Sequence, residues 1–494
     1  MKSIVRNAVR YGCYLDSVAL MRLSREVATL RGVEAAALMM ATPANKAMLA
    51  EAGLLDADGR AAGANDLILA VRAEGGEAAK AALAAAAQLL EAKPSAGNAA
   101  LSKQARSLRT ALGAQPGANL ALISVPGDYA AAEARRALSC GLDVMIFSDN
   151  VPLAEEVALK RDGQALGRLV LGPDCGTAII GGTPLAFANR VPRGDIGLIG
   201  ASGTGLQEVS CLIAAAGGGI SHAIGVGSRD LGREVGALST LAAIDLFDAD
   251  PATAHLVLIS KPPDAEVVAT VLARIGQSRK RCTVCFLGGP AMPLPPNATA
   301  AATLSAAAEA ALGRPIAAGP ATAPRPAPRR GLILGLYSGG SLAAEAQLVL
   351  LAAGRAVASN AAIPGAAALA SAAAPADRII DLGADEFTRG RPHPMIDPGL
   401  RNDQLARALA DPSVAVILLD LVLGLGAHPD PAREVASVLA GAPAQHPPVI
   451  ASVTGTEADP QVRSRQIATL QASGVLLAPS NAGAAALAVA LARS

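Results

Sequence analysis

The residues best suited to bind an anion lie in one glycine-rich stretch near the middle of the chain. Residues 196–208 read as a short buried strand, a turn and the start of a helix. A helix that begins at such a turn presents free backbone N–H groups at its positive end. Ser202 and Thr204 add hydroxyl donors there, and Gly203 lies between them. The stretch predicts an anion site, although it is neither a Walker loop nor a strict G-x-G-x-x-G motif.

A second stretch of the same kind lies further along the chain. The apolar residues 332–337 predict a strand, and Ser338, Gly339 and Gly340 turn it into another helix. We expect phosphate-binding donors here as well. If the two helix N-termini faced each other, they would double the positive potential at a shared anion. No feature of the sequence shows that they do, so their pairing is a hypothesis.

Polar residues that follow other predicted strands are candidates for contacts with a substrate, because ligands bind at the carboxyl ends of parallel strands. These candidates are Asp174, Cys175, Arg229, Thr454 and Thr456. Arg229 either reaches the ligand or forms a structural pair with Asp230. Cys175 would be the nucleophile of a thioester mechanism, but a buried thiol is the simpler interpretation.

Two further candidate sites depend on basic residues. Asn45 and Lys46 follow Thr42 and Pro43 at a predicted helix start, where Lys46 either contacts an anion or is a solvated helix residue.

His393 lies in a proline-bounded loop with Arg391, and this loop could bind a dicarboxylate-like substrate. The alternative for His393 is a turn histidine whose ring hydrogen-bonds to the backbone.

Composition excludes several classes of protein. The chain has 494 residues with 42 basic and 41 acidic side chains and no basic run, which disfavours nucleic-acid binding. It lacks a long uncharged apolar run and a signal-peptide core, so we expect a cytoplasmic protein without a membrane anchor. Cys282 and Cys285 have metal-like spacing, but no second pair completes a site, so we expect two core thiols and no metal.

Strands and helices alternate along the chain, which predicts an α/β protein built of several doubly wound parallel-sheet domains of the Rossmann or flavodoxin type. We expect an N-terminal α/β domain over residues 1–98 and a Rossmann-type domain over 99–190. A ligase-like domain over 191–312 and another over 331–494 would follow. The Pro-, Ala- and Arg-rich segment 313–330 between them predicts a linker.

Three motifs in the middle of the chain resemble the succinyl-CoA synthetase α subunit: Leu171-Gly-Pro-Asp-Cys-Gly-Thr177, Gly200-Ala-Ser-Gly-Thr-Gly-Leu-Gln-Glu208 and Gly225-Val-Gly-Ser-Arg-Asp230. The part after the linker resembles the carboxyl-terminal ligase domain of the β subunit. Together with Tyr11-Gly-Cys-Tyr-Leu-Asp-Ser-Val18 and Gly390-Arg-Pro-His-Pro-Met-Ile-Asp-Pro398, the full length resembles the FdrA family, which fuses these halves. The resemblance implies that 99–190 is CoA-binding-like, that Ser202, Gly203 and Thr204 cradle phosphate, and that Glu208 has a catalytic role.

The chain also departs from the synthetases. The segment that carries their phosphorylated histidine reads Gly288-Gly-Pro-Ala-Met-Pro-Leu-Pro-Pro296 here and contains no histidine. The ATP-grasp half of the β subunit has no counterpart, and the glycine-rich coenzyme A loop is not evident. These departures leave an anion site between ligase-like domains.

The resemblance to FdrA implies a subunit of an oxamate carbamoyltransferase-like enzyme of allantoin breakdown, which converts oxalurate and phosphate to oxamate and carbamoyl phosphate. Glu208 and His393 are the catalytic candidates. An acyl-CoA synthetase component, with coenzyme A as a possible cofactor, is one alternative. A non-catalytic scaffold that binds a phosphorylated metabolite is another. We expect a small anionic substrate, partner subunits and a homo- or hetero-oligomer.

Overall fold

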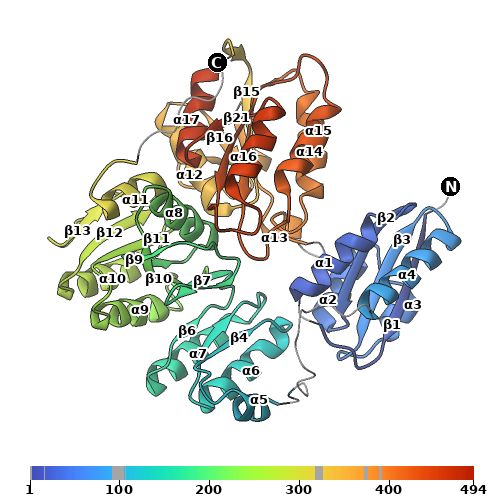
Figure 1. Cartoon of the computed structure of the whole chain (residues 1–494), viewed down its shortest axis with the longest axis horizontal. Coiled ribbons are helices and arrows are strands. Elements are labelled where there is room, and N and C mark those ends of the chain that lie inside the picture. The colour runs from blue at the N-terminus through green and yellow to red at the C-terminus, as the bar shows by residue number, and fades with distance from the viewer. Residues whose placement is uncertain are drawn as a thin grey trace.

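Four α/β units follow one another along the chain in the computed structural model, which describes residues 3–15, 17–91, 105, 107–316, 326–371, 376–388 and 392–493 (Figure 1). Residues 317–325, half of the expected linker, lie outside the described residues. The alternation of strands and helices confirms the predicted α/β class.

The N-terminal unit has a three-stranded antiparallel sheet in the order β1-β3-β2. Its elements are β1 Ile4–Arg10, α1 Ser17–Ala28, β2 Val33–Met40, α2 Pro43–Glu51, α3 Ala57–Ala61, β3 Leu67–Ala73 and α4 Gly76–Glu91. Thr42 begins α2 as its N-cap, since its hydroxyl accepts the N–H of Asn45, and Pro43 follows at the first position. β1 and β2 run parallel to each other with β3 between them, which is a split β-α-β arrangement.

The second unit contains a parallel three-stranded sheet in the order β4-β5-β6. Its elements are α5 Leu108–Ala114, β4 Leu120–Ile123, α6 Gly127–Ser139, β5 Asp143–Ile146, α7 Leu153–Leu166 and β6 Val170–Leu171. The apolar side of α6 packs on β5, mainly through alanines.

The third unit contains a seven-stranded sheet in the order β13-β12-β11-β9-β10-β7-β8. Its elements are β7 Thr177–Ile180, β8 Thr183–Ala186, β9 Arg193–Gly200, α8 Gly203–Ala215, β10 Ile220–Gly225, α9 Leu238–Ala249, β11 His255–Ser260, α10 Ala265–Gln277, β12 Arg281–Phe286, β13 Ala298–Ala300 and α11 Leu304–Leu312. Strand β7 pairs antiparallel with β10 and forms an antiparallel hairpin with β8, whereas the other pairs in the sheet are parallel. This sheet therefore begins before residue 190, where the sequence placed a domain boundary.

The fourth unit contains a parallel seven-stranded sheet in the order β17-β16-β18-β15-β19-β20-β21. Its strands are β15 Leu332–Tyr337, β16 Val357–Ser359, β17 Ala367–Ala368, β18 Asp377–Asp381, β19 Val414–Val422, β20 Val449–Thr454 and β21 Leu476–Ala478. Its helices are α12 Gly340–Ala352, α13 Asp385–Thr388, α14 Gly399–Leu409, α15 Pro431–Ala440, α16 Arg463–Ala472 and α17 Asn481–Leu491. A short parallel pair, β14 Arg329–Arg330 and β22 Ala492–Arg493, joins the two ends of this unit.

The third and fourth units share one hydrophobic core. Helices α8 and α11 of the third unit pack against α12 and α17 of the fourth, and most of the buried side chains between them are alanine and leucine. Small side chains let these helices approach closely. The shared core fixes the relative position of the two units, and with it the position of every group at the ends of α8 and α12.

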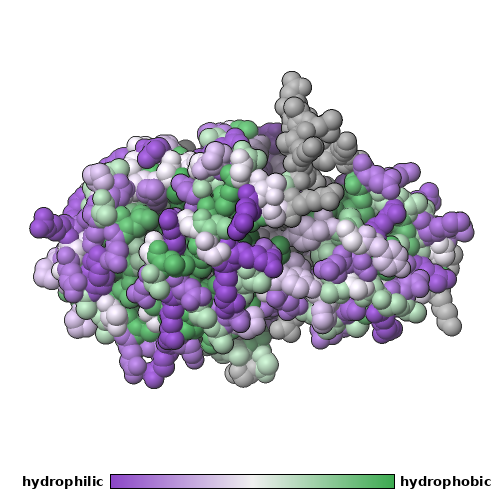
Figure 2. All heavy atoms as spheres, turned by 90° about the horizontal axis from the view of Figure 1, so that it is seen from below, coloured by the Kyte–Doolittle hydropathy of each residue, from purple (hydrophilic) through white to green (hydrophobic). Residues whose placement is uncertain are grey.

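Among the described residues, no helix is long and apolar enough to cross a membrane. Polar and charged side chains are interspersed with smaller apolar groups over the face shown in Figure 2.

Candidate active site

All four units contribute to the wall of a cavity of about 1080 Å³. Its lining includes Asn45 of the first unit, Asp149 of the second, Ser202 of the third and Ser338 of the fourth. The cavity lies at the carboxyl ends of β9, β10, β11, β15 and β18, which is where parallel sheets bind ligands.

The N-termini of α8 and α12 meet in this cavity. The hydroxyl groups of Ser202 and Ser341 hydrogen-bond to each other across the boundary between the units. A Cβ atom added to Gly339 would lie 2.9 Å from Cγ2 of Thr204, so the two turns are in contact. In the described part of the chain, no group accepts the N–H groups of Gly203, Thr204, Gly340 or Ser341. The two helix ends therefore face each other and leave donors free at one place.

The donors of the turn before α12 are already satisfied. The carboxylate of Asp420, two residues before the end of β19 at Val422, accepts the N–H groups of Ser338 and Gly339, each at 2.7 Å. Arg401 donates to the hydroxyl of Ser338 and to the carbonyl of Asp420. Burial raises the pKa of Asp420 to about 6, and Arg401 and the two N–H donors oppose the shift. We expected Ser338 and Gly339 to bind phosphate, but their backbone N–H groups donate to this internal carboxylate. Of the three residues in this turn, only Gly340 has an N–H group free to bind an anion.

A cation that the sequence analysis missed lies beside these helix ends. Lys261 follows β11 and lines the cavity. A Cβ atom added to Gly340 would lie 3.0 Å from Nζ of Lys261 and 2.7 Å from Oδ2 of Asp381. Burial raises the pKa of Asp381, and the charge of Lys261 opposes the shift. The position of Lys261 at the end of a predicted strand was the available signal, as it was for the other candidates.

His393 reaches the same corner from the loop before α14. Its Nδ1 accepts the N–H of Met395 at 3.2 Å, and its Nε2 lies 2.8 Å from the point where a Cβ of Gly383 would be. Burial lowers the pKa of His393 to about 4, so the ring is neutral near neutral pH. The alternative interpretation is confirmed, because the ring hydrogen-bonds to the backbone. The ring also lines the cavity, and its part in binding a substrate stays a prediction.

Glu208 is buried below the cavity, in α8. Its carboxylate accepts the hydroxyl of Thr454, and the N–H of Asn481 at 3.2 Å. Asn481 also donates through its side chain to Glu345 of α12 at 2.7 Å. Burial raises the pKa of both carboxyl groups, that of Glu345 to about 7, and the charge of Glu208 contributes to the latter. Glu208 and Thr454 therefore do not line the cavity. Glu345 is buried beside them and is linked to Glu208 through Asn481.

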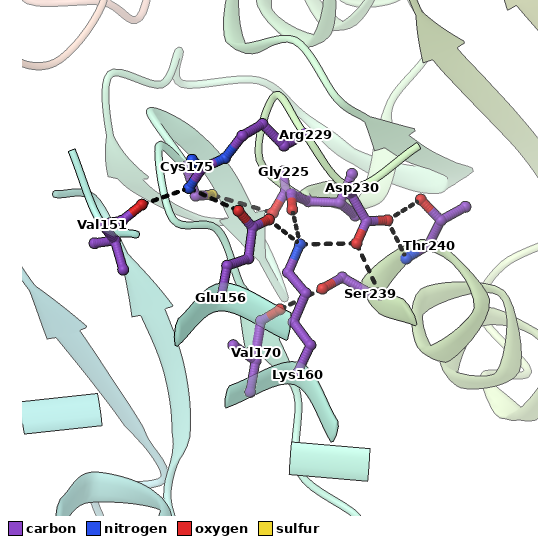
Figure 3. Close-up of polar contacts among 11 residues, drawn as sticks. Val151, Glu156, Lys160, Val170, Cys175, Gly225, Arg229, Asp230, Ser239 and Thr240 are labelled. Atoms are coloured by element: carbon purple, nitrogen blue, oxygen red, sulfur yellow. Dashed lines mark hydrogen bonds and ion pairs between the residues drawn. The ribbon is translucent and has the colours of Figure 1, made fainter. Parts of the chain in front are cut away.

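Arg229, itself exposed, pairs with a buried charge network that joins the second and third units (Figure 3). It forms an ion pair with Glu156 at 2.7 Å, whereas Asp230 pairs with Lys160 at 2.8 Å. Asp230 also accepts the first N–H groups of α9. The sequence analysis considered Arg229 and Asp230 as partners of each other, but each pairs with a residue of α7. The network fixes the loop that carries Arg229 against the cavity.

The remaining candidates are divided between the cavity and other places. Asp174 and Asn45 line it, and the side chain of Asn45 also donates to the carbonyl of Met40. Cys175 lines it too, but its thiol donates to the carbonyl of Gly225, and burial raises its pKa to about 12, which makes it a poor nucleophile.

Two candidates lie elsewhere, and the place of a third is not described. Lys46 donates to the carbonyl groups of Arg60 and Ala62, and Thr456 donates to that of Arg190, so both have structural partners away from the cavity. Arg391 lies outside the described residues.

Three family models match the chain. "AllF, heavy metal-associated domain" matches residues 1–107, "CoA binding domain" matches 193–287, and "CoA-ligase" matches 336–491. The CoA-binding match thus falls on the third unit, whereas the sequence analysis placed a CoA-binding-like fold at 99–190. The heavy-metal description does not fit the residues present. Cys13 is the one cysteine in 1–107, and the described residues contain no cluster of His, Cys, Asp or Glu that could hold a metal ion.

Known proteins are similar to the chain over different lengths. YahF of Escherichia coli (strain K12), an uncharacterized protein, is 38% identical over 98% of both chains. The ADP-forming sulfoacetate-CoA ligase subunit SauD of Bilophila wadsworthia is 26% identical over 36% of this chain and 61% of its own. The ADP-forming succinate–CoA ligase subunit alpha of Aquifex aeolicus is 29% identical over 30% of this chain and 49% of its own.

Among solved structures, an acetyl-coenzyme A synthetase of Ca. Korarchaeum cryptofilum is 16% identical and covers 76% of this chain and 82% of its own, with a TM-score of 0.29. Its likeness carries no argument at that score. The full-length similarity to YahF decides the family. The chain belongs to the family of YahF, with an AllF-type N-terminal domain followed by CoA-binding and CoA-ligase domains.

Proposed function

We propose that the chain is a subunit that transfers an acyl-type group to or from inorganic phosphate where α8 and α12 meet. The observation that carries this proposal is the pair of facing helix N-termini, with unpaired N–H groups and Lys261 in one cavity. A doubly charged anion between two helix N-termini gains from both dipoles and from the ammonium group. The same donors would stabilise the oxyanion that forms when phosphate attacks an acyl carbon.

The reaction we assign first is that of an FdrA-type oxamate carbamoyltransferase, in which oxalurate and phosphate give oxamate and carbamoyl phosphate. Transfer to free phosphate needs neither a nucleotide nor a phosphorylated histidine. The segment 288–296 contains no histidine and does not line the cavity. None of the three matching family models is an ATP-grasp module. These observations favour phosphorolysis over ATP-driven ligation by this chain alone.

An acyl-CoA ligase component is the second candidate, supported by the CoA-ligase match and the similarity to a sulfoacetate-CoA ligase subunit. The turn between β4 and α6 of the second unit disfavours the binding of a diphosphate at that turn. Asp128 places a carboxylate in the first turn of α6, and a Cβ on Gly127 would lie 2.4 Å from the carbonyl oxygen of Asp149. Negative charge and tight packing both disfavour the diphosphate of coenzyme A at this position.

The test is an assay of oxalurate phosphorolysis with this chain, alone and with the products of neighbouring genes, and with carbamoyl phosphate as the measured product. We expect carbamoyl phosphate only when partner subunits are present and only when phosphate is supplied. Turnover of ATP and coenzyme A without any carbamoyl phosphate would replace this proposal with the ligase alternative.

A further inference from the structure

We propose that this site holds phosphate without a covalent phosphohistidine, with Lys261 as its fixed cation and His393 as a neutral hydrogen-bond donor. The inference rests on the proposed function and specifies how the phosphate and the acyl group are held.

Lys261 has the position and the freedom that this role requires. Its side chain is exposed to the cavity, and among the described residues no carboxylate forms an ion pair with it. Its Nζ lies next to the first residue of α12, Gly340, where the N–H groups of the helix are free. The ammonium group therefore lies beside two helix N-termini whose first N–H groups are free, with the carboxylate of Asp381 next to it. Other carboxylates, among them Asp149 and Asp174, line the cavity as well. An anion held here would take the free N–H groups and the ammonium group together.

The hydrogen bonding of His393 assigns its proton. Because Nδ1 accepts the backbone N–H of Met395, the proton of the neutral ring is on Nε2. A protonated Nε2 has no lone pair with which to attack phosphorus, so it cannot become phosphorylated while this hydrogen bond holds. The low pKa of the ring, a result of burial, agrees with a neutral donor. Nε2–H faces the turn at Gly383, beside Asp381 and the start of α12.

These groups support a direct transfer of the carbamoyl group from oxalurate to phosphate. A phosphate oxygen forms a bond to the carbamoyl carbon of oxalurate, and the bond from that carbon to the nitrogen shared with the oxalyl group breaks. The proton carried by the attacking hydrogen phosphate moves to the departing nitrogen, which gives oxamate. Lys261 offsets the charge on phosphate, and Nε2–H of His393 donates to the carbonyl oxygen as it becomes negative. No oxidant, metal or nucleotide takes part.

Binding of inorganic phosphate, measured by isothermal titration calorimetry on the full chain, tests Lys261. We expect Lys261→Met to weaken binding at least tenfold and Lys261→Arg to retain most of it. Lys80→Met on the exposed face of α4, away from the cavity, is the matched control and should bind like the wild type. Equal affinity in Lys261→Met and the wild type would overturn the assignment of the cation.

A separate experiment tests whether a histidine becomes phosphorylated and whether His393 acts as a hydrogen-bond donor. After incubation of the chain and its partner subunits with ³²P-labelled carbamoyl phosphate, we expect no acid-labile, alkali-stable label on the protein. His393→Gln, which keeps an N–H donor, should retain more turnover than His393→Ala at the same phosphate affinity. Labelled phosphohistidine, or equal turnover in the two variants, would overturn the inference even if carbamoyl transfer occurs. Phosphate binding that depends on Lys261, without carbamoyl transfer, would instead remove only the proposed reaction.

Discussion

The N-termini of α8 and α12 have similar local structures but differ in the groups that accept their backbone N–H hydrogen bonds. Each helix follows a central strand of its sheet through a glycine- and serine-containing turn, and each carries a buried glutamate five residues after its first residue, Glu208 in one and Glu345 in the other. Ser202 caps α8 with its own side chain, whereas the N-cap of α12 is Gly339, which has no side chain to cap it. Asp420 instead takes the donors of the turn before α12.

This difference assigns separate tasks to the two helix ends. The turn of α12 is fixed from within by Asp420 and Arg401, so it is a rigid wall that presents only its first N–H groups. The turn of α8 has no internal carboxylate, and Ser202 and Thr204 are only partly buried. We infer that α8 makes the adaptable contacts with the anion and that α12 holds its position. The following predictions test this division.

Asp420→Asn should have the largest effect on stability. It leaves Arg401 buried without its counter-charge and turns one acceptor into a donor that faces an N–H group, so we expect a loss of about 3 kcal/mol in the free energy of unfolding. Urea denaturation measures it, with Asp403→Asn on the exposed side of α14 as control. A loss no greater than that of the control would mean that Asp420 does not hold the turn.

Glu345→Gln should change the pH dependence of stability. The native pKa of Glu345, about 7, lies above that of a free glutamate, so the folded protein retains this proton to a higher pH than the unfolded chain. Its contribution therefore favours folding at low pH and is lost as pH rises from about 4.5 through 7. Between about pH 5 and about pH 8, the wild type should lose on the order of 2 kcal/mol more stability than Glu345→Gln. Parallel curves for the two proteins would refute the shift.

Ser202→Ala should have the smallest effect on stability, and it should also weaken the binding of phosphate. The loss of its N-cap hydrogen bond costs about 1 kcal/mol, and the hydrogen bond to Ser341 is lost with it. Ser480→Ala removes the corresponding cap of α17 and is the control for the cap alone. Only Ser202→Ala should also weaken phosphate binding in calorimetry, because Ser480 does not line the cavity. Equal phosphate affinity in both variants would remove Ser202 from the site.

The sequence predicted the fold better than it predicted the contacts of the site. Strands and glycine-rich turns were visible because each depends on neighbouring residues, and the apolar run of β19 is buried at every position. The antiparallel N-terminal sheet was not predicted, because alternating strands and helices also fit a parallel unit. Asp420 and Glu345 were missed because their partners, Ser338 and Asn481, lie far from them in the sequence. Such pairings depend on the shared core of the third and fourth units.

The most direct test of the central claim is a crystal structure of the chain grown with tungstate, which replaces phosphate and is located by its anomalous scattering. Our account predicts one strong peak between the turn at Ser202–Thr204 and the first residues of α12, within reach of Lys261. A peak elsewhere in the cavity, or none at this junction while tungstate binds other helix N-termini, would contradict it.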